Sequence, residues 1–171
     1  MQSDLSTSQN VIARLKAYED ACNRYDVDAA VAMFAEDGVL TFDGERIAGQ
    51  AALRAAHEWD KRAHNQVGFS DYIVEGKIVR CTFVNCHELH RILGIDAIRR
   101  PAEVIFNHDR IQTCVLLAPN PHDLQRFRQL SAPFWDWAAA QHPEQLAKIR
   151  APGAEGGSAL FSLAHAWHDQ R

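Results

Sequence analysis

Residues 85–90, NCHELH, concentrate side chains that can move protons or bind metals: a cysteine, a glutamate and two histidines within six positions. The helical zinc-protease signature needs two histidines four residues apart with a glutamate beside the first. Here His87 and His90 are three apart. We expect the segment to continue a strand, in which residues three apart point to opposite faces. His87 and His90 then cannot share a metal, and we expect no metal site.

His87 raises a second question, because it falls on the more apolar face of that predicted strand. Phe83 and Asn85 share this face, whereas Arg80 and Thr82 lie on the other. A histidine on an apolar face is either a core residue satisfied by a neighbour or a pocket group able to donate, accept or shuttle a proton. The strand pattern alone leaves both alternatives open.

Three other polar residues lie near an earlier predicted strand and the helix before it. Asp71 is in register with Val67 and Phe69 in that strand, where a carboxylate would have a raised pKa and could act as a base. The alternative is a solvated residue at a strand edge. His64 either enters that strand as a pocket group or ends the preceding helix in solvent. His57 lies off the apolar side of that helix, so we expect it to be solvated.

The elements that must position these residues change type along the chain. Apolar spacing predicts helices over about 10–25, 27–34 and 50–63, with Asp26 as a cap and Gly38 as a left-handed stop. Strands rich in β-branched and aromatic residues are predicted over 39–42, 67–74, 77–93, 102–108 and 110–118. Helices followed by a run of strands indicate an α+β fold.

After Pro119 the pattern is helical again. Prolines divide it into segments at 122–130, 133–142 and 143–150, and a last helix is predicted from a cap at Ser158. This tail is rich in aromatic residues, which must be buried against something. The alternatives are a lid over the open end of the fold, a dimer interface, and simple packing.

Composition excludes several classes of protein. The formal net charge is -4 and the pI about 6.1, with no basic stripe, so we expect no nucleic-acid partner. No apolar run approaches the roughly 18 residues of a membrane helix, so we expect no membrane association. The first ten residues lack the plan of a signal peptide. The cysteines are widely spaced, which favours reduced thiols and a cytoplasmic protein.

The stretch AYEDACNRYDVDAAVAMFAEDGVLTFDG, residues 17–44, followed by GQAAL, resembles the opening of the nuclear transport factor 2-like (SnoaL-like) superfamily. The resemblance covers about 5–118, which we take as that domain, with 119–171 as a helical C-terminal extension. It implies an α+β fold in which a cone-shaped, curved antiparallel sheet packs on three helices. Isomerases, dehydratases, cyclases, epoxide hydrolases and non-enzymatic binders share this fold, so the resemblance specifies the architecture and leaves the reaction open.

The resemblance also implies site residues. Tyr18 falls where ketosteroid isomerases keep the tyrosine that hydrogen-bonds the enolate oxygen, but Phe42 replaces their general base. Scytalone dehydratase-like members use two pocket histidines, near whose positions His64 and His87 fall. Cys22 and Phe42 fall near positions where those dehydratases keep tyrosines, so this match is also partial.

We therefore expect an acid/base enzyme of the isomerase, dehydratase or cyclase type. It would act on a small, mostly apolar metabolite with no cofactor. His87 is the expected general acid/base, His64 or Asp71 its partner, and Tyr18 the group that polarises a carbonyl. The residues expected to bind substrate are Cys22, Phe42, Trp59, Phe69, Phe83, Asn85 and Phe106. The alternative is a non-catalytic binding or dimerisation module of the same fold, and we expect a homodimer in either case.

Overall fold

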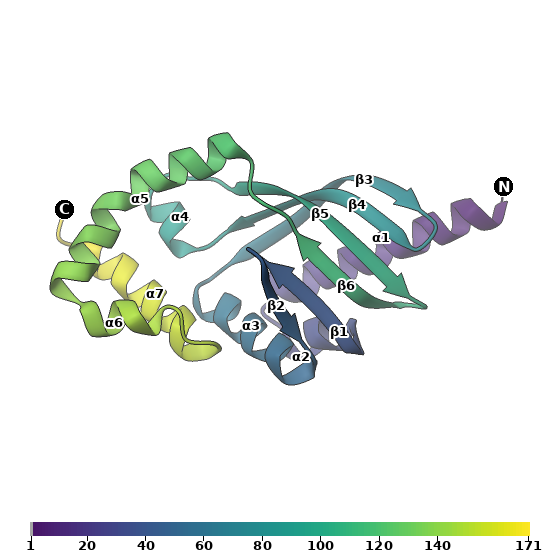
Figure 1. The fold of residues 1–171 in the computed structure, drawn as a ribbon, viewed down its shortest axis with the longest axis horizontal. Helices are drawn as coiled ribbons and strands as arrows, with labels where there is room; N and C mark the ends of the chain where they lie inside the picture. The colour runs from purple at the N-terminus through teal and green to yellow at the C-terminus, as the bar shows by residue number, and fades with distance from the viewer. Residues whose placement is uncertain (1) are drawn as a thin grey trace.

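We describe the fold from a computed structural model of the chain, which covers residues 2–171, with side chains described from Gln9 onward. Within that range the chain forms a six-stranded sheet and seven helices (Figure 1). The helices are α1 Gln2–Asn23, α2 Val27–Ala32, α3 Gln50–Arg62, α4 Glu88–Ile92, α5 Pro121–Gln141, α6 Pro143–Lys148 and α7 Ala154–His168. The strands are β1 Phe34–Phe42, β2 Glu45–Ala48, β3 Gln66–Glu75, β4 Ile78–Cys86, β5 Ile98–Asn107 and β6 Arg110–Leu116.

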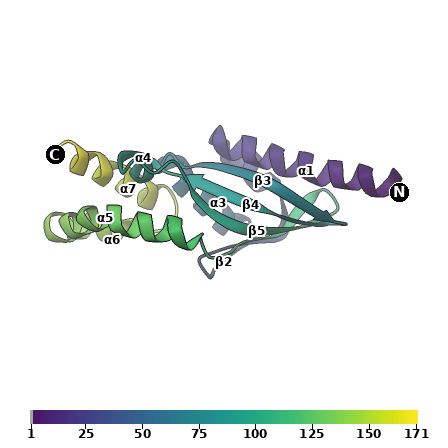
Figure 2. The same cartoon turned by 90° about the horizontal axis from the view of Figure 1, so that it is seen from above.

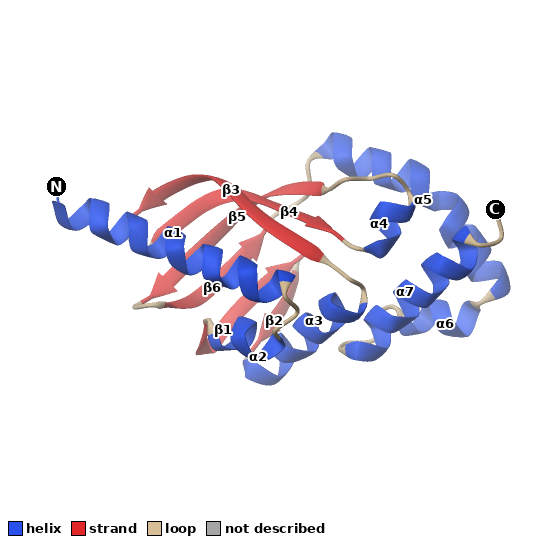
Figure 3. Cartoon of the chain, turned by 180° about the vertical axis from the view of Figure 1, so that it is seen from behind, coloured by secondary structure: helices blue, strands red, loops and turns tan. Residues whose placement is uncertain are grey.

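The sheet has the order β2-β1-β6-β5-β4-β3. Neighbouring strands are antiparallel except β1 and β6, which are parallel. The curved sheet has α1 lying across one face, with α2 and α3 beside it (Figures 2 and 3). The predicted α+β architecture of a curved sheet on three helices is confirmed, and the parallel junction is the exception to the predicted antiparallel pairing.

The first apolar core fills the space between the sheet and these three helices. Strand alternation sends one face of β4, β5 and β6 inward, and helical spacing sends one stripe of α1 to meet it. The residues that fill this core include Val11, Leu15, Tyr18, Phe34, Leu53, Phe69, Phe83, Val104, Phe106 and Ile111. The interior of the cone is therefore packed with side chains.

Side chains of α1 satisfy the free edge of β3. The Asn23 amide donates to the carbonyl oxygen of Val67 at 2.9 Å and accepts from the Val67 N–H at 2.8 Å. One turn earlier, Glu19 accepts from the N–H of Phe69 at 2.9 Å. Because these contacts replace the bonds of a missing neighbouring strand, they close the edge and fix the end of α1 against β3.

A second apolar core joins the C-terminal helices to α3 and α4. Its buried members are Ala63, Leu89, Phe134, Leu160, Leu163, Ala164 and Trp167. Helix α7 approaches α3 so closely at Gly157 that an added Cβ would collide with the carbonyl oxygen of Trp59. The aromatic tail thus packs on the end of α3, at the end of the molecule opposite the start of α1 (Figure 1).

Several local predictions were wrong. Gly38 lies inside β1 with no left-handed backbone, and a Cβ there would sit 2.9 Å from the carbonyl oxygen of Ala35. Close backbone approach, not a helix stop, is what requires this glycine. Helix α5 continues through Pro133, and α7 begins well before Ser158. Within residues 2–171, no helix combines the length and apolarity needed to cross a bilayer.

Candidate functional site

Tyr18 and His57 form a buried, hydrogen-bonded pair between α1 and α3. The Tyr18 hydroxyl lies 2.9 Å from Nε2 of His57, and only 6% and 5% of the two residues are exposed. Nδ1 of His57 lies 2.7 Å from the carbonyl oxygen of Leu53, one turn earlier in α3. Because a carbonyl oxygen can only accept, Nδ1 carries a proton, and in this tautomer Nε2 accepts from the Tyr18 hydroxyl.

Helical spacing brings these groups together. Leu53, His57 and Asp60 follow one another at steps of four and three, which places them on one side of α3. The prediction that His57 is solvated was wrong, because α3 is buried along two sides. The Leu53 stripe faces the first core, and Trp59 faces the second.

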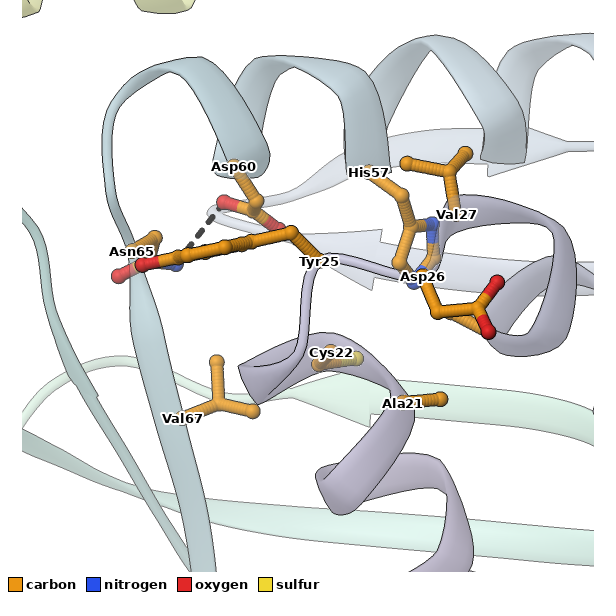
Figure 4. Close-up of a pocket in the computed structure, with 10 residues that line it drawn as sticks. Ala21, Cys22, Tyr25, Asp26, Val27, His57, Asp60, Asn65 and Val67 are labelled. Atoms are coloured by element: carbon orange, nitrogen blue, oxygen red, sulfur yellow. Dashed lines mark hydrogen bonds between the residues drawn. The ribbon is translucent and has the colours of Figure 1, made fainter.

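A small pocket lies beside this pair, between the end of α1 and α3. The room left for the centre of a water molecule is about 10 Å³, enough for about one water. Its lining residues are Ala21, Cys22, Tyr25, Asp26, Val27, Ala30, His57, Asp60, Asn65 and Val67. The ring of Tyr25 lies across the pocket near Asp60 and Asn65 (Figure 4). The Asn65 amide donates to the Asp60 carboxylate at 2.8 Å.

Burial changes the proton affinity of the groups around this pocket. It raises the pKa of the Asp60 carboxyl, against the opposing effects of nearby His57 and the Asn65 hydrogen bond. Burial also raises the pKa of Tyr18 well above its usual range, and the neighbouring Cys22 adds to that shift. The pKa of the Cys22 thiol is raised mainly by burial as well. The phenol and the thiol therefore stay protonated at neutral pH, and burial makes the Asp60 carboxyl easier to protonate than an exposed one.

His87 and His90 lie at the start of a short helix, not in a strand. β4 ends at Cys86, because β5 begins at Ile98, which pairs with Asn85 and leaves the following residues without a partner. The His87 N–H donates to Nδ1 of His90 at 3.2 Å, and the two rings stack with centroids 3.6 Å apart. The prediction that the two histidines point to opposite faces was therefore wrong.

This histidine pair packs against the second core. The His87 ring lies edge-on to Trp59, and the His90 ring edge-on to Phe127. Nδ1 of His87 is buried, with no partner among the described side chains. Burial lowers the pKa of His87 well below its usual range, and His90 and Arg91 lower it further. Burial also lowers the pKa of His90 to about 4. Both rings are therefore neutral at physiological pH.

Solved structures resemble this arrangement of sheet and helices, although no protein-family model and no curated protein sequence matches the chain. An uncharacterised cystatin-fold protein from Novosphingobium aromaticivorans has a TM-score of 0.53 and 18% identity, over 64% of this chain and 97% of that one. A protein from Cytophaga hutchinsonii, described as NTF2-like and of unknown function, has a TM-score of 0.53 and 11% identity over 67% and 94%. A provisionally named polyketide cyclase from Sinorhizobium meliloti has a TM-score of 0.54 and 19% identity over 61% and 94%. The chain has the nuclear transport factor 2-like fold.

In this fold, the residues predicted to bind substrate are dispersed. Phe69, Phe83 and Phe106 are buried in the first core. Cys22 lines the small pocket, and Asn85 is buried with its Oδ1 unpartnered among the described side chains. Two more lie outside that pocket: Phe42 beneath the guanidinium of Arg100 and Trp59 against the second core. Their roles in binding remain predictions.

His64 and Asp71 lie apart from the Tyr18–His57 pair. His64 is exposed after the end of α3, with its ring 4.4 Å from that of Phe161. Asp71 is exposed where the β3–β4 register shifts, and it accepts from the Ser70 hydroxyl at 2.9 Å. That irregularity breaks the alternation on which the inward prediction for Asp71 rested. Among the described residues, no three His, Cys, Asp or Glu side chains gather as a metal site would need.

Sequence reasoning placed Tyr18 and Cys22 near the site but missed His57, Asp60 and Asn65. A usable signal was present, because His57 and Asp60 continue the spacing of Leu53 along α3. The aromatic Trp59 on the same helix indicated a different buried side. Helix α3 buries both sides, one against the first core and one against the C-terminal helices.

Proposed function

We propose that the chain is a cofactor-independent acid/base enzyme of the isomerase, dehydratase or cyclase type. Its substrate would be a small, mostly apolar hydroxy-carbonyl or polycyclic compound. The observation that carries this proposal is the 2.9 Å contact between the Tyr18 hydroxyl and His57 beside a pocket lined by Asp60. Proteins provisionally named as polyketide cyclases share the fold at 19% and 20% identity, which supports the architecture alone.

Asp60 is the base in this proposal. As a carboxylate it takes a proton from the carbon next to the substrate carbonyl, and the electron pair of the broken C–H bond passes to the carbonyl oxygen as the enolate forms. Tyr18 donates its hydroxyl hydrogen bond to that oxygen in place of His57, bringing no charge into the pocket. The proton on Asp60 then returns to another carbon in an isomerisation, or to a leaving hydroxyl in a dehydration. His57 is a positioning residue, because its Nε2 accepts from Tyr18 and holds that hydroxyl in place until the substrate oxygen takes over the hydrogen bond.

Substrate access requires the pocket to open at Tyr25. This residue has a left-handed backbone, with φ of 58°, in the turn between α1 and α2. Its hydroxyl accepts from the Gln66 amide at 2.7 Å. Its ring lies across the pocket (Figure 4). Rotation of this one side chain would widen the pocket without disturbing the core.

The test is the exchange of α-protons for deuterium in 2-tetralone, a bicyclic ketone, followed by NMR in D₂O. We expect the wild type to exceed the buffer rate. Asp60→Asn and Tyr18→Phe should each reduce the excess by about a hundredfold. Asp71→Asn is the matched control, since Asp71 is an exposed carboxylate. If Asp60→Asn keeps the wild-type rate, Asp60 is not the base.

A non-catalytic binding or dimerisation module is the second candidate. The observation that favours it is the packed interior of the cone, which leaves room for about one water in the small pocket beside the Tyr18–His57 pair. This candidate predicts that 2-tetralone exchanges no faster than in buffer with wild-type protein. It also predicts that Tyr25→Ala, which would open the pocket, produces no exchange activity.

We also propose that the chain forms a homodimer through the face of the sheet away from α1. Thr82, Val84 and Ile105 alternate with the inward residues of β4 and β5, so they lie on this face and are half-buried. Figure 2 shows α1 on the opposite side of the sheet. Sedimentation equilibrium should give the mass of two chains for the wild type. Val84→Arg should give one chain, and an unchanged mass would place the interface elsewhere.

A further inference from the structure

A larger hollow lies on another part of the molecule, where the β1–β2 turn meets the end of β6. Its volume is about 400 Å³, within the range of small-molecule sites. The residues that line it are Thr41, Asp43, Gly44, Val115, Leu116, Leu117, Ala118 and Pro119. The walls are mostly apolar, and Leu117 is 50% exposed, one of the few large apolar side chains open to solvent. None of these residues lines the pocket beside Tyr18 and His57. We call this hollow the β6 groove.

Arg100 lies directly behind the wall of the β6 groove. Its Nη1 donates to Oδ1 of Asp43 at 2.7 Å and to the carbonyl oxygen of Leu117 at 3.4 Å, and both acceptor residues line the groove. The guanidinium carbon lies 4.4 Å from the centroid of the Phe42 ring, over its face, within the range of a cation–π contact. The Arg100 cation therefore lies behind an apolar groove and contacts two of the residues that line it.

The pairing of this guanidinium is incomplete. The Arg100 side chain is only 5% exposed, whereas that of Asp43 is 55% exposed. Both of these hydrogen bonds start from Nη1, and Nε is buried with no partner among the side chains from Gln9 onward. A guanidinium presents a fork of donors that a carboxylate can take in two parallel bonds, and burying it with part of that fork unused is costly.

Asp43 is the partner that can be exchanged. It occupies the β1–β2 turn with a left-handed backbone, φ 49°, and its side chain lies half in solvent. Turning that side chain outward returns its carboxylate to water and frees Nη1 for another acceptor. A second carboxylate arriving through the groove would take over the contact and bring an apolar body to rest against Leu117 and its neighbours.

We propose that the β6 groove binds a small amphipathic carboxylic acid, whose carboxylate replaces Asp43 on Arg100 and whose apolar part lies along the groove. Asp43 then acts as an internal substitute for the ligand's carboxylate when the groove is free. A phosphate fits less well, because no cationic side chain lines the groove itself and Asp43 would repel its second charge. The β6 groove is separate from the small pocket beside the Tyr18–His57 pair, and binding there does not depend on the acid/base reaction proposed for that pocket.

The experiment is calorimetric titration of the whole chain with octanoate, using octan-1-ol and octylamine as probes of the same chain length. We expect octanoate to bind, and the alcohol and amine to bind at least about tenfold more weakly, which is the scale of one charge-assisted contact. Arg100→Met should weaken octanoate by about tenfold or more. Asp43→Asn should tighten it several-fold, because the competing charge is gone. Arg99→Met is the matched control, since Arg99 is exposed and pairs with Asp123.

The test is decisive because the two substitutions in one ion pair should change octanoate affinity in opposite directions. A purely structural pair predicts no octanoate affinity in any variant, or equal affinity for octanoate and octan-1-ol, and either result overturns the proposal. If Arg100→Met does not fold, Asp43→Asn and Leu117→Glu decide. Unchanged or weaker binding to Asp43→Asn, or unchanged binding to Leu117→Glu, overturns it as well. Circular dichroism of every variant confirms that the protein measured is folded.

Discussion

The molecule contains two buried aromatic–histidine clusters, on two sides of α3, and they are built differently. On one side the Tyr18 hydroxyl, the His57 ring and the Leu53 carbonyl oxygen form a complete donor–acceptor chain beside the acid Asp60. On the other side the His87 and His90 rings stack, and Nδ1 of His87 has no partner among the described side chains.

The difference shows why a buried histidine alone does not define a site. Acid/base catalysis needs a group that can exchange protons with a substrate, and neighbours whose hydrogen bonds hold the reacting groups in place. The Tyr18–His57 cluster has both features and opens onto a pocket. The His87–His90 cluster instead holds α4 against the C-terminal helices, and burial keeps both rings neutral. For this reason our proposal assigns the chemistry to the first cluster.

The largest expected effect comes from disrupting the second apolar core, against which the His87–His90 cluster packs. Phe134 is fully buried there, so Phe134→Ala should lower the free energy of unfolding by about 3–5 kcal/mol. Urea denaturation followed by tryptophan fluorescence measures this directly, because all four tryptophans lie in or against this core. The control is Leu130→Ala, at an exposed position of the same helix, which should cost less than about 1 kcal/mol. A similar loss in both variants would mean that the tail is not packed as described.

The next largest effect is a loss of folding stability in acid, caused by protonation of His90. The pKa of His90 falls from 6.5 to about 4 on folding, so between those values the unfolded chain binds more protons. The stabilisation is complete above about pH 6.5 and is lost as the pH falls through the folded value, a change of about 3 kcal/mol from this group. Protonated His90 can no longer accept from the His87 N–H, and Arg91 and Arg100 oppose its charge.

Urea midpoints of the tryptophan signal from pH 7.5 down to 4 check this prediction. His90→Asn keeps an acceptor near the position of Nδ1 but cannot be protonated, so its stability should depend less on pH. Glu88 contacts Arg91 and His165, and both contacts also weaken in acid as Glu88 is protonated. The difference between His90→Asn and wild type isolates the histidine. Equal pH dependence in the two proteins would contradict the role given to His90.

The fold could be predicted from the sequence because its signals are local and consistent. The stripe of Val11, Leu15 and Tyr18, the Asp26 cap and the alternating strands each specify one element, and the structure has all of them. The capping bond from the Ala29 N–H to Asp26, at 3.0 Å, is one direct example. Such patterns depend on neighbours in sequence, which a single chain reveals.

The site could be predicted only in part, because it depends on which faces are covered by distant segments. His57 was expected in solvent, since α3 was given one buried side and the C-terminal helices bury another. His87 was given a strand position, but β4 stops where β5 offers no further partner. Asp71 lost its inward register at an irregularity between Ser70 and Ile73. Each error follows from a tertiary contact that overrides a local pattern.

The smallest expected effects belong to the two exposed candidates. His64→Asn and Asp71→Asn should each change the free energy of unfolding by no more than about 0.5 kcal/mol. Asparagine tolerates the left-handed backbone that both positions have, with φ of 52° and 55°. Neither substitution should change the exchange of 2-tetralone protons. A hundredfold loss in either variant would return that residue to the catalytic role predicted from the sequence.

The most direct test of the account compares His57→Leu with His87→Leu in one assay. Both substitutions remove a buried ring, and only His57 contacts Tyr18. The measurement is the rate of 2-tetralone proton exchange per folded molecule, with the folded fraction taken from circular dichroism. We predict a loss of about a hundredfold for His57→Leu and a wild-type rate for His87→Leu. A loss confined to His87→Leu would contradict the account and place the chemistry in the second cluster.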